Sequence, residues 1–261
     1  MELHIATRVF LALLGWSLLL QTLEFFRLLH LDRVGSWAIQ REEVPPRPAW
    51  VRGVLDHAVE GPGYVLVLCL RLGLALMLMA GWVHLASAGL LFASSVLLLF
   101  RWRGAFNGGS DFMTLVAVSG LLIAQGVGHF TGNADMGWRA GLWYVTVYVV
   151  SSYFVSGWVK LLRPEWRNGR AMTIFLDGGV YGPLSPNSVY RHPFVARCVS
   201  WTFTVWEGCF PLALWDVRIA WFMCAVAPVF HFLVYWYFGL NRFFWAWLVT
   251  YPAVLYCAWG S

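Results

Sequence analysis

Residues 151–172 read SSYFVSGWVKLLRPEWRNGRAM, and this stretch shows the pattern on which the rest of the chain is built. An apolar, aromatic run passes Gly157, reaches Lys160 and gives way to a polar turn with Pro164 and Trp166. Apolar segments of about 20 residues that end in basic residues are typical of helices that cross a membrane.

Lys160 is the only lysine in the chain, whereas the other seventeen of the 18 basic residues are arginine. Arginine keeps its proton in proteins, but a lysine that is removed from water can lose it. The use of lysine at this one position therefore indicates a need for a titratable amine. The alternative is a lysine at the membrane surface, with its stem in lipid and its ammonium group among the headgroups.

The composition excludes an ordinary soluble protein. Hydrophobic residues make up 60% of the chain and charged residues 12%, and the mean hydropathy is +0.65. The 17 Trp, 19 Phe and 10 Tyr suit aromatic belts at a membrane surface or the walls of a site for a flat ring. We therefore predict an all-α, polytopic integral membrane protein whose main partner is the lipid bilayer.

Eight apolar segments are long enough to cross a bilayer, and we expect them to form one domain over residues 1–261. They cover residues 7–30, 64–82, 84–100, 112–130, 142–162, 198–214, 219–238 and 243–258. The stretch 163–197 mixes apolar residues with Pro and Gly, and we interpret it as a re-entrant or interfacial segment that covers the bundle.

The basic residues lie between the apolar segments, so the net charge of +5 indicates topology rather than nucleic-acid binding. With eight crossings, twelve arginines fall on one side and three on the other. The positive-inside rule then places the basic side, which also carries most polar motifs, in the cytoplasm. We expect the inner (plasma) membrane of a bacterium.

The five cysteines are dispersed, without a CxxC pair or metal-ligand spacing, and we predict neither a disulfide framework nor a bound metal.

Ionisable residues inside apolar segments are costly, so each is a functional candidate. Glu207 lies four residues before Pro211, and we expect it to be neutral or paired with Lys160 or an arginine. His231 can donate to a ring oxygen or relay a proton, although such a histidine is more often structural. Arg71 needs a partner, for which Glu24 is the nearest candidate.

The patch FNGGSD at residues 106–111 is a weaker signal. Its glycines allow close backbone approach, and Asn107 and Asp111 flank them. Asp111 has the position of an N-cap for the next segment, and capping is the alternative to a role in a site.

Several ordered motifs resemble one family. SGWVKLLRPEWRNGRAM, the following PLSP and RHPF, FTVWEGCFPLAL and FGLNRFFWAWLVTYPA are similar to the HTTM domain, the membrane domain shared with vitamin K-dependent gamma-glutamyl carboxylase. The similarity extends from about residue 101 to 252.

The resemblance implies an enzyme that oxidises a vitamin K-like hydroquinone with O2 to an epoxide, a step that the carboxylase couples to the uptake of CO2 by peptide glutamate. Lys160 stands at the position of the catalytic lysine and would deprotonate the hydroquinone. Trp158 and Trp166 suit the walls of a quinone site. Glu207, His231, Asn107 and Asp111 would position the substrate or tune the base, and Arg191 would line an entrance.

The chain also departs from the carboxylase. The lysine pair of the animal enzyme is here Val159-Lys160, and the chain given ends at Ser261, so we do not expect the large peptide-binding domain. Quinol oxygenation or epoxidation is therefore a stronger expectation than peptide carboxylation. The alternative is a non-catalytic membrane subunit that docks a partner enzyme or assists the maturation of a secreted peptide. A transporter is less expected because no inverted repeat is evident.

Overall fold

The computed structural model describes residues 1–29, 37–42, 48–102 and 108–259, and every regular element in these ranges is a helix. The longest are α1 (Leu3–Leu28), α4 (Gly61–Met79), α5 (Leu85–Trp102), α6 (Gly108–Thr131), α7 (Ala134–Leu162) and α11 (Val217–Phe238). The shorter ones are α2 (Trp37–Glu42), α3 (Ala49–Val59), α8 (Pro164–Arg167), α9 (Arg170–Asp177), η1 (Val189–Arg191), α10 (Pro193–Gly208), η2 (Phe210–Leu214), α12 (Asn241–Leu248) and α13 (Tyr251–Trp259).

Each of the six longest helices is long and apolar enough to cross a membrane. This finding confirms the predicted class, an all-helical membrane protein, within the described residues. Six helices meet the criterion where we predicted eight. The segments predicted at 198–214 and 243–258 each contain a break: α10 ends before η2, and α12 and α13 have eight and nine residues.

Prolines account for these breaks, because a proline has no backbone N–H and is best tolerated in the first turn of a helix. Pro211 lies at the start of η2, and Pro252 is the second residue of α13.

The helices divide into two compact units. The N-terminal unit comprises Glu2–Gly141 and Trp245–Val249, and the C-terminal unit comprises Leu142–Phe244 with Thr250–Ser261 and Met1. We expected a single domain over residues 1–261, and the division into two compact units leaves that expectation a prediction.

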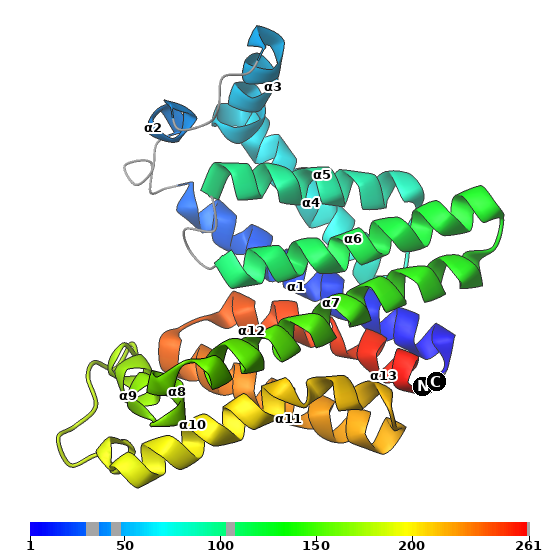
Figure 1. Cartoon of the computed structure of the whole chain (residues 1–261). Coiled ribbons are helices and arrows are strands. Elements are labelled where there is room, and N and C mark those ends of the chain that lie inside the picture. Colours follow the sequence, from blue (N-terminus) through cyan, green and yellow to red (C-terminus); the bar gives the residue numbers. More distant parts are fainter. Residues whose placement is uncertain (30–36, 43–47, 103–107, 260–261) are drawn as a thin grey trace. The chain divides into compact units, whose positions relative to one another are not determined.

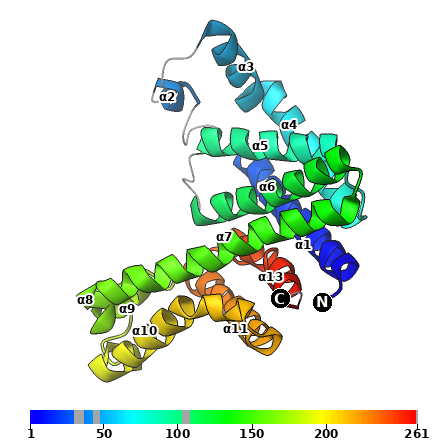
Figure 2. The same ribbon diagram turned by 45° about the vertical axis from the view of Figure 1, so that its right-hand side comes forward.

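In the N-terminal unit, α1 packs along α4 and α5 packs along α6, as Figures 1 and 2 show for the latter pair. Phe25 of α1 stacks on Trp102 of α5 with ring centroids 6.0 Å apart. The indole N–H of Trp102 donates to the Tyr64 hydroxyl of α4 over 3.0 Å. These rings, with Leu68 and Leu98, form a buried apolar cluster.

In the C-terminal unit, α7 ends at Leu162 because Arg163, which precedes Pro164, is extended. Gly157 of α7 lies directly against the backbone of Gly208 of α10, where a Cβ atom would collide. This close approach brings the end of α7 that carries Lys160 next to the end of α10 that carries Glu207.

The segment that we interpreted as covering the bundle is largely helical. It forms α8, α9 and η1, which lie beside the start of α10 at the end of α7 (Figure 1). The N–H of Val180 donates to the carbonyl of Tyr237 over 3.0 Å, and Gly179 packs against the Tyr237 ring. These contacts fasten the segment to the end of α11.

Candidate functional site

Lys160 and Glu207 form the polar centre of the C-terminal unit. The Lys160 Nζ donates to the Glu207 carboxylate and, over 2.8 Å, to the Ser156 hydroxyl one helical turn earlier on α7. The Ser156 hydroxyl in turn donates to Glu207 Oε2 over 3.2 Å. The side chain of Lys160 is 18% exposed and that of Glu207 is 4% exposed. The two charges therefore compensate each other at a place where neither side chain is well hydrated. We predicted either Lys160 or an arginine as the partner of a charged Glu207, and the structure has Lys160.

Trp166 is the third member of this group. The Lys160 Nζ lies 5.3 Å from the centroid of the Trp166 ring, which is within the range of a cation–π interaction. The Ser200 hydroxyl of α10 donates to the Trp166 carbonyl over 2.5 Å and so fixes α8 in place. The residues expected to act together at the end of α7 thus lie together.

A cavity of about 380 Å³ borders Lys160, Trp166 and Glu207. It is lined otherwise by apolar and aromatic residues of α9, η1, α10 and α11: Met172, Phe175, Leu176, Tyr190, Val199, Phe203, Phe230, Leu233, Val234, Trp236, Tyr237 and Phe238. A volume of about 300–1,000 Å³ with apolar walls and few polar groups is typical of small-molecule sites. We call this cavity the aromatic pocket.

Several apolar residues that line the aromatic pocket are also exposed at the surface of the protein. Leu233 and Trp236 of α11 are 52% and 59% exposed, and Phe175 and Tyr190 are exposed as well. The polar pair lies among the more buried of its lining residues. This arrangement suits a flat apolar molecule that carries a single polar or acidic group.

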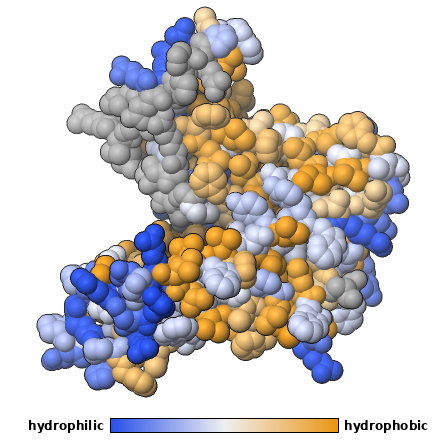
Figure 3. Space-filling model, in the orientation of Figure 1, coloured by the Kyte–Doolittle hydropathy of each residue, from blue (hydrophilic) through white to orange (hydrophobic). Residues whose placement is uncertain are grey.

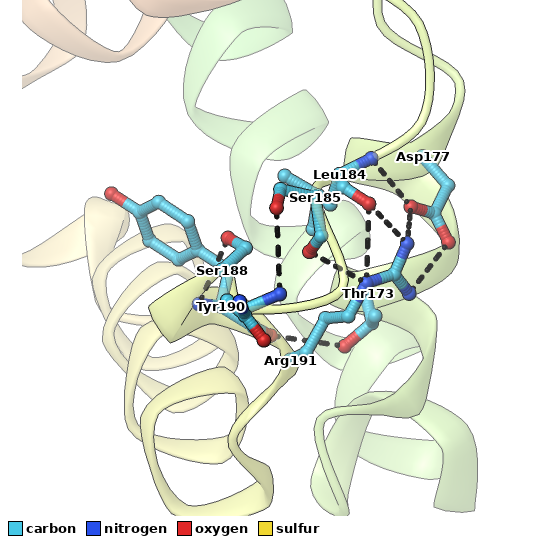
Figure 4. Close-up of polar contacts among 8 residues, drawn as sticks. Thr173, Asp177, Leu184, Ser185, Ser188, Tyr190 and Arg191 are labelled. Carbon is cyan, nitrogen blue, oxygen red and sulfur yellow. Dashed lines mark hydrogen bonds and ion pairs between the residues drawn. The ribbon is translucent and has the colours of Figure 1, made fainter.

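Arg191 directly follows the pocket-lining Tyr190 in the sequence, but its guanidinium binds other residues of the protein (Figure 4). It contacts both carboxylate oxygens of Asp177, at 2.8 and 3.3 Å, and donates to the carbonyls of Leu184 and Ser185. The place of Arg191 at an entrance for substrate stays a prediction, and the contacts seen hold that segment together. We call the pair of Arg191 and Asp177 the clamp.

The clamp sets the position of Tyr190, whose ring points away from the guanidinium (Figure 4) and lines the aromatic pocket. The Tyr190 N–H contacts the Ser188 hydroxyl at 3.4 Å, and the Thr173 hydroxyl donates to the Tyr190 carbonyl over 3.4 Å. Through these contacts α9 and η1 form one wall of the pocket.

His231 lies behind the pocket wall. Its Nε2 is 2.6 Å from the Tyr153 hydroxyl, which is also 2.9 Å from the Tyr251 hydroxyl. The neighbouring Phe230 lines the pocket, and its ring meets that of His231 edge to face. Direct contact of His231 with a ligand stays a prediction, and the contacts seen join α7, α11 and α13.

The remaining predicted residues lie elsewhere. Trp158 is 46% exposed, packs edge to face on Phe154 and is not among the pocket-lining residues. Asp111 belongs to the N-terminal unit, where it accepts a hydrogen bond from Gln21 over 2.9 Å. Asn107 lies outside the described residues.

Asp111 is part of a buried polar cluster around Arg71, which is 1% exposed. The guanidinium donates to Gln21 Oε1 over 2.6 Å and to the hydroxyls of Ser94 and Ser95 over 3.0 and 2.8 Å. Gln21 is therefore a partner of Arg71 on α1, three residues before the Glu24 that we expected.

Sequence reasoning missed Ser156 and most of the aromatic wall. Ser156 stands one turn before Lys160, and Phe203 one turn before Glu207, so helical spacing from the two charged residues identifies them. No such spacing identifies the pocket-lining residues of α9 and η1, because their position depends on how the segment between α7 and α10 folds back. Within the described residues, no group of three or more His, Cys, Asp or Glu is placed to hold a metal ion.

Comparisons of the chain with known protein families, with characterised proteins and with solved structures give no match.

Proposed function

We propose that the protein is a membrane enzyme that binds a hydroquinone or a similar apolar molecule in the aromatic pocket and oxidises it with O2, with Lys160 as general base. The observation that carries this proposal is the position of the chain's only lysine at the polar end of a pocket of about 380 Å³ that is otherwise apolar. The resemblance of the residues around Lys160 to the HTTM domain supports the same chemistry.

The ion pair explains how Lys160 becomes a base. The ammonium group has to lose a proton before it can accept one, and the Glu207 carboxylate is its direct hydrogen-bond acceptor. Transfer within the pair leaves a neutral amine beside a neutral acid. The amine then takes the hydroxyl proton of the hydroquinone, and the resulting ammonium group faces the phenolate.

The phenolate is the species that reacts with O2. In the epoxidation that the resemblance implies, one hydroquinone and one O2 give the epoxide and one water. A coupled carboxylation with CO2 belongs to this proposal only where a peptide substrate is supplied.

The finer topology is also a proposal. The broken pairs α10–η2 and α12–α13 complete the count of eight crossings, and the basic side faces the cytoplasm of a bacterial cell. Reporter fusions placed after each apolar segment test this arrangement, and two adjacent reporters on the same side contradict it.

The catalytic proposal is tested with Lys160→Arg. Arginine keeps the positive charge beside Glu207 but cannot give up its proton. We expect O2 uptake and epoxide formation with reduced naphthoquinones to fall by about 100-fold or more, because general-base catalysis contributes about 10²–10⁴-fold. Thermal unfolding of both purified proteins checks that the variant is folded, and equal turnover by a folded variant refutes the role of Lys160.

The second candidate is a non-catalytic membrane subunit for a partner enzyme or a maturing peptide. The observation in its favour is the ion pair itself, since a purely structural pair needs only the two charges. In that case Lys160→Arg keeps full function in the assembly, and no reduced quinone is turned over.

A further inference from the structure

A second hollow in the C-terminal unit, distinct from the aromatic pocket, has a charged rim and an apolar floor. This groove of about 630 Å³ is lined by Leu161 and Leu162 at the end of α7, by Arg167 of α8, and by Arg197 and Trp201 of α10. Helix α8 contributes to both hollows, since Trp166 lines the pocket and Arg167 lines the groove. Figure 3 shows hydrophilic residues gathered over α8 and α9, next to apolar surface of the same unit.

The two arginines of the groove stand on backbone that is held firmly. The indole N–H of Trp201 donates to the Arg167 carbonyl over 3.0 Å, one residue along from the bond between Ser200 and Trp166. Gly169 has a φ of +85° and packs against the backbone of Arg197 so closely that a Cβ atom would collide. The spacing of Arg167 and Arg197 is therefore set by α8 and α10 and not by a mobile loop.

Arg167 and Arg197 are exposed and form no ion pair with any acidic residue in the described part of the chain. Two arginines on one rim without a carboxylate favour an anion, and the planar fork of guanidinium donors matches the oxygens of a phosphate.

The apolar floor narrows the choice of anion. Leu161, Leu162 and Trp201 are the large apolar residues of the lining and form this floor, and Leu162 is 70% exposed. A free phosphate has no use for such a floor, whereas a lipid with a charged headgroup places its acyl chain there. Basic hollows at the ends of membrane helices are a known setting for anionic lipid headgroups.

We propose that this groove binds the phosphodiester group of an anionic glycerophospholipid between Arg167 and Arg197, with the first part of an acyl chain along Leu161, Leu162 and Trp201. The bound lipid ties α8 to α10 from outside. Because the same short helix holds Trp166 against Lys160, the lipid also supports one wall of the aromatic pocket.

The test is a titration of phosphatidylglycerol into the protein in neutral detergent micelles, followed by the midpoint of thermal unfolding. Parallel titrations use phosphatidylcholine, which has no net charge, and glycerol phosphate, which lacks acyl chains. The groove variant is Arg167→Gln with Arg197→Gln. The matched control is Arg163→Gln with Arg170→Gln, which removes the same charge from the same stretch but not from the groove lining.

We expect phosphatidylglycerol to raise the midpoint of the wild type and of the control, and to bind the groove variant about 30-fold more weakly, since each arginine near an anionic headgroup contributes about 1 kcal/mol. Where the double variant does not fold, Arg197→Gln alone carries the test with about a fivefold weakening.

Three results overturn the proposal. An equal loss in the groove variant and the control shows a general effect of surface charge. Equal stabilisation by glycerol phosphate shows a site for a soluble anion. The absence of any effect of phosphatidylglycerol on the wild type shows that the groove does not hold the lipid.

Discussion

Arg71 in the N-terminal unit and Lys160 in the C-terminal unit are both cations among apolar helices, but their surroundings differ. The guanidinium of Arg71 is surrounded by Gln21, Ser94 and Ser95 and borders a void of only about 10 Å³, roughly the space of one water molecule. Lys160 contacts Ser156 and Glu207 and borders a pocket of about 380 Å³. Arg71 is therefore enclosed by the protein, whereas Lys160 also borders open space.

The choice of residue agrees with this contrast. Arginine stays charged at any working pH, so its site has to be polar at all times. A lysine that is removed from water can lose its proton, so a lysine site does not have to stay charged at all times. The remaining experiments either break this comparison or make it sharper.

The largest expected effect is on stability, from Asp111→Leu. Asp111 accepts a hydrogen bond from Gln21 and lies within electrostatic range of Arg71. A guanidinium keeps its charge at working pH. We expect a loss of about 3–5 kcal/mol in the free energy of unfolding, as for other buried charges that lose a partner. Unfolding in mixed micelles measures it.

The matched substitution is Glu207→Leu, which removes the carboxylate beside Lys160. We expect a loss of no more than about 2 kcal/mol, because the amine can be neutral and still faces the Ser156 hydroxyl. Equal losses for the two variants would mean that both clusters are structural and would remove the basis for the comparison.

The next effect concerns ligand affinity and uses Val199→Trp, which fills the aromatic pocket from α10. We expect the affinity for a naphthoquinone to fall at least about tenfold, equivalent to about 1.4 kcal/mol, with little change in unfolding. Ligand-induced shifts in the thermal midpoint measure it. Val205→Trp serves as the control, because Val205 is on the same helix and is 50% exposed. A similar fall in affinity for this variant would indicate that the ligand binds outside the pocket.

The sequence was sufficient to predict the class of fold and the polar end of the pocket. Apolar segments of membrane length identified the six long helices, and the scarcity of lysine indicated Lys160. The cost of a carboxylate in an apolar segment made Glu207 a candidate, with Lys160 or an arginine as the expected partner if it is charged. These signals are local, because each depends on one residue and the polarity of its neighbours.

The remaining parts depended on long-range geometry. The apolar stretch that begins at residue 142 continues a helix that starts at Ala134, since helical structure extends through polar residues at a segment's end. The clamp joins residues 14 apart across a turn whose path no periodicity predicts. The position of His231 behind Phe230 depends on how α7, α11 and α13 pack.

A smaller effect on affinity is expected from Asp177→Asn, which weakens the clamp. The clamp is partly exposed, at 34% for each side chain, so its loss costs about 1 kcal/mol. Because Tyr190 and Phe175 then hold the pocket wall less firmly, we expect about a fivefold weaker affinity for a naphthoquinone. Glu165→Gln, in the same covering segment but outside the clamp, should bind as tightly as the wild type. An unchanged affinity in Asp177→Asn would show that the pocket wall does not depend on the clamp.

The smallest expected effect comes from a substitution that tests whether His231 takes part in the site. Tyr153→Phe removes the hydroxyl that meets His231 and Tyr251 but keeps the ring stacked on Phe210, with centroids 4.2 Å apart. Hydrogen bonds between membrane helices contribute about 0.6 kcal/mol on average, so we expect a loss of about that size in the free energy of unfolding. Quinone affinity and turnover should stay unchanged if this cluster only joins α7, α11 and α13. A fall in turnover without a loss of stability would instead connect Tyr153 and His231 to the movement of protons at Lys160, and the C-terminal unit would then hold a polar network that extends beyond the pair.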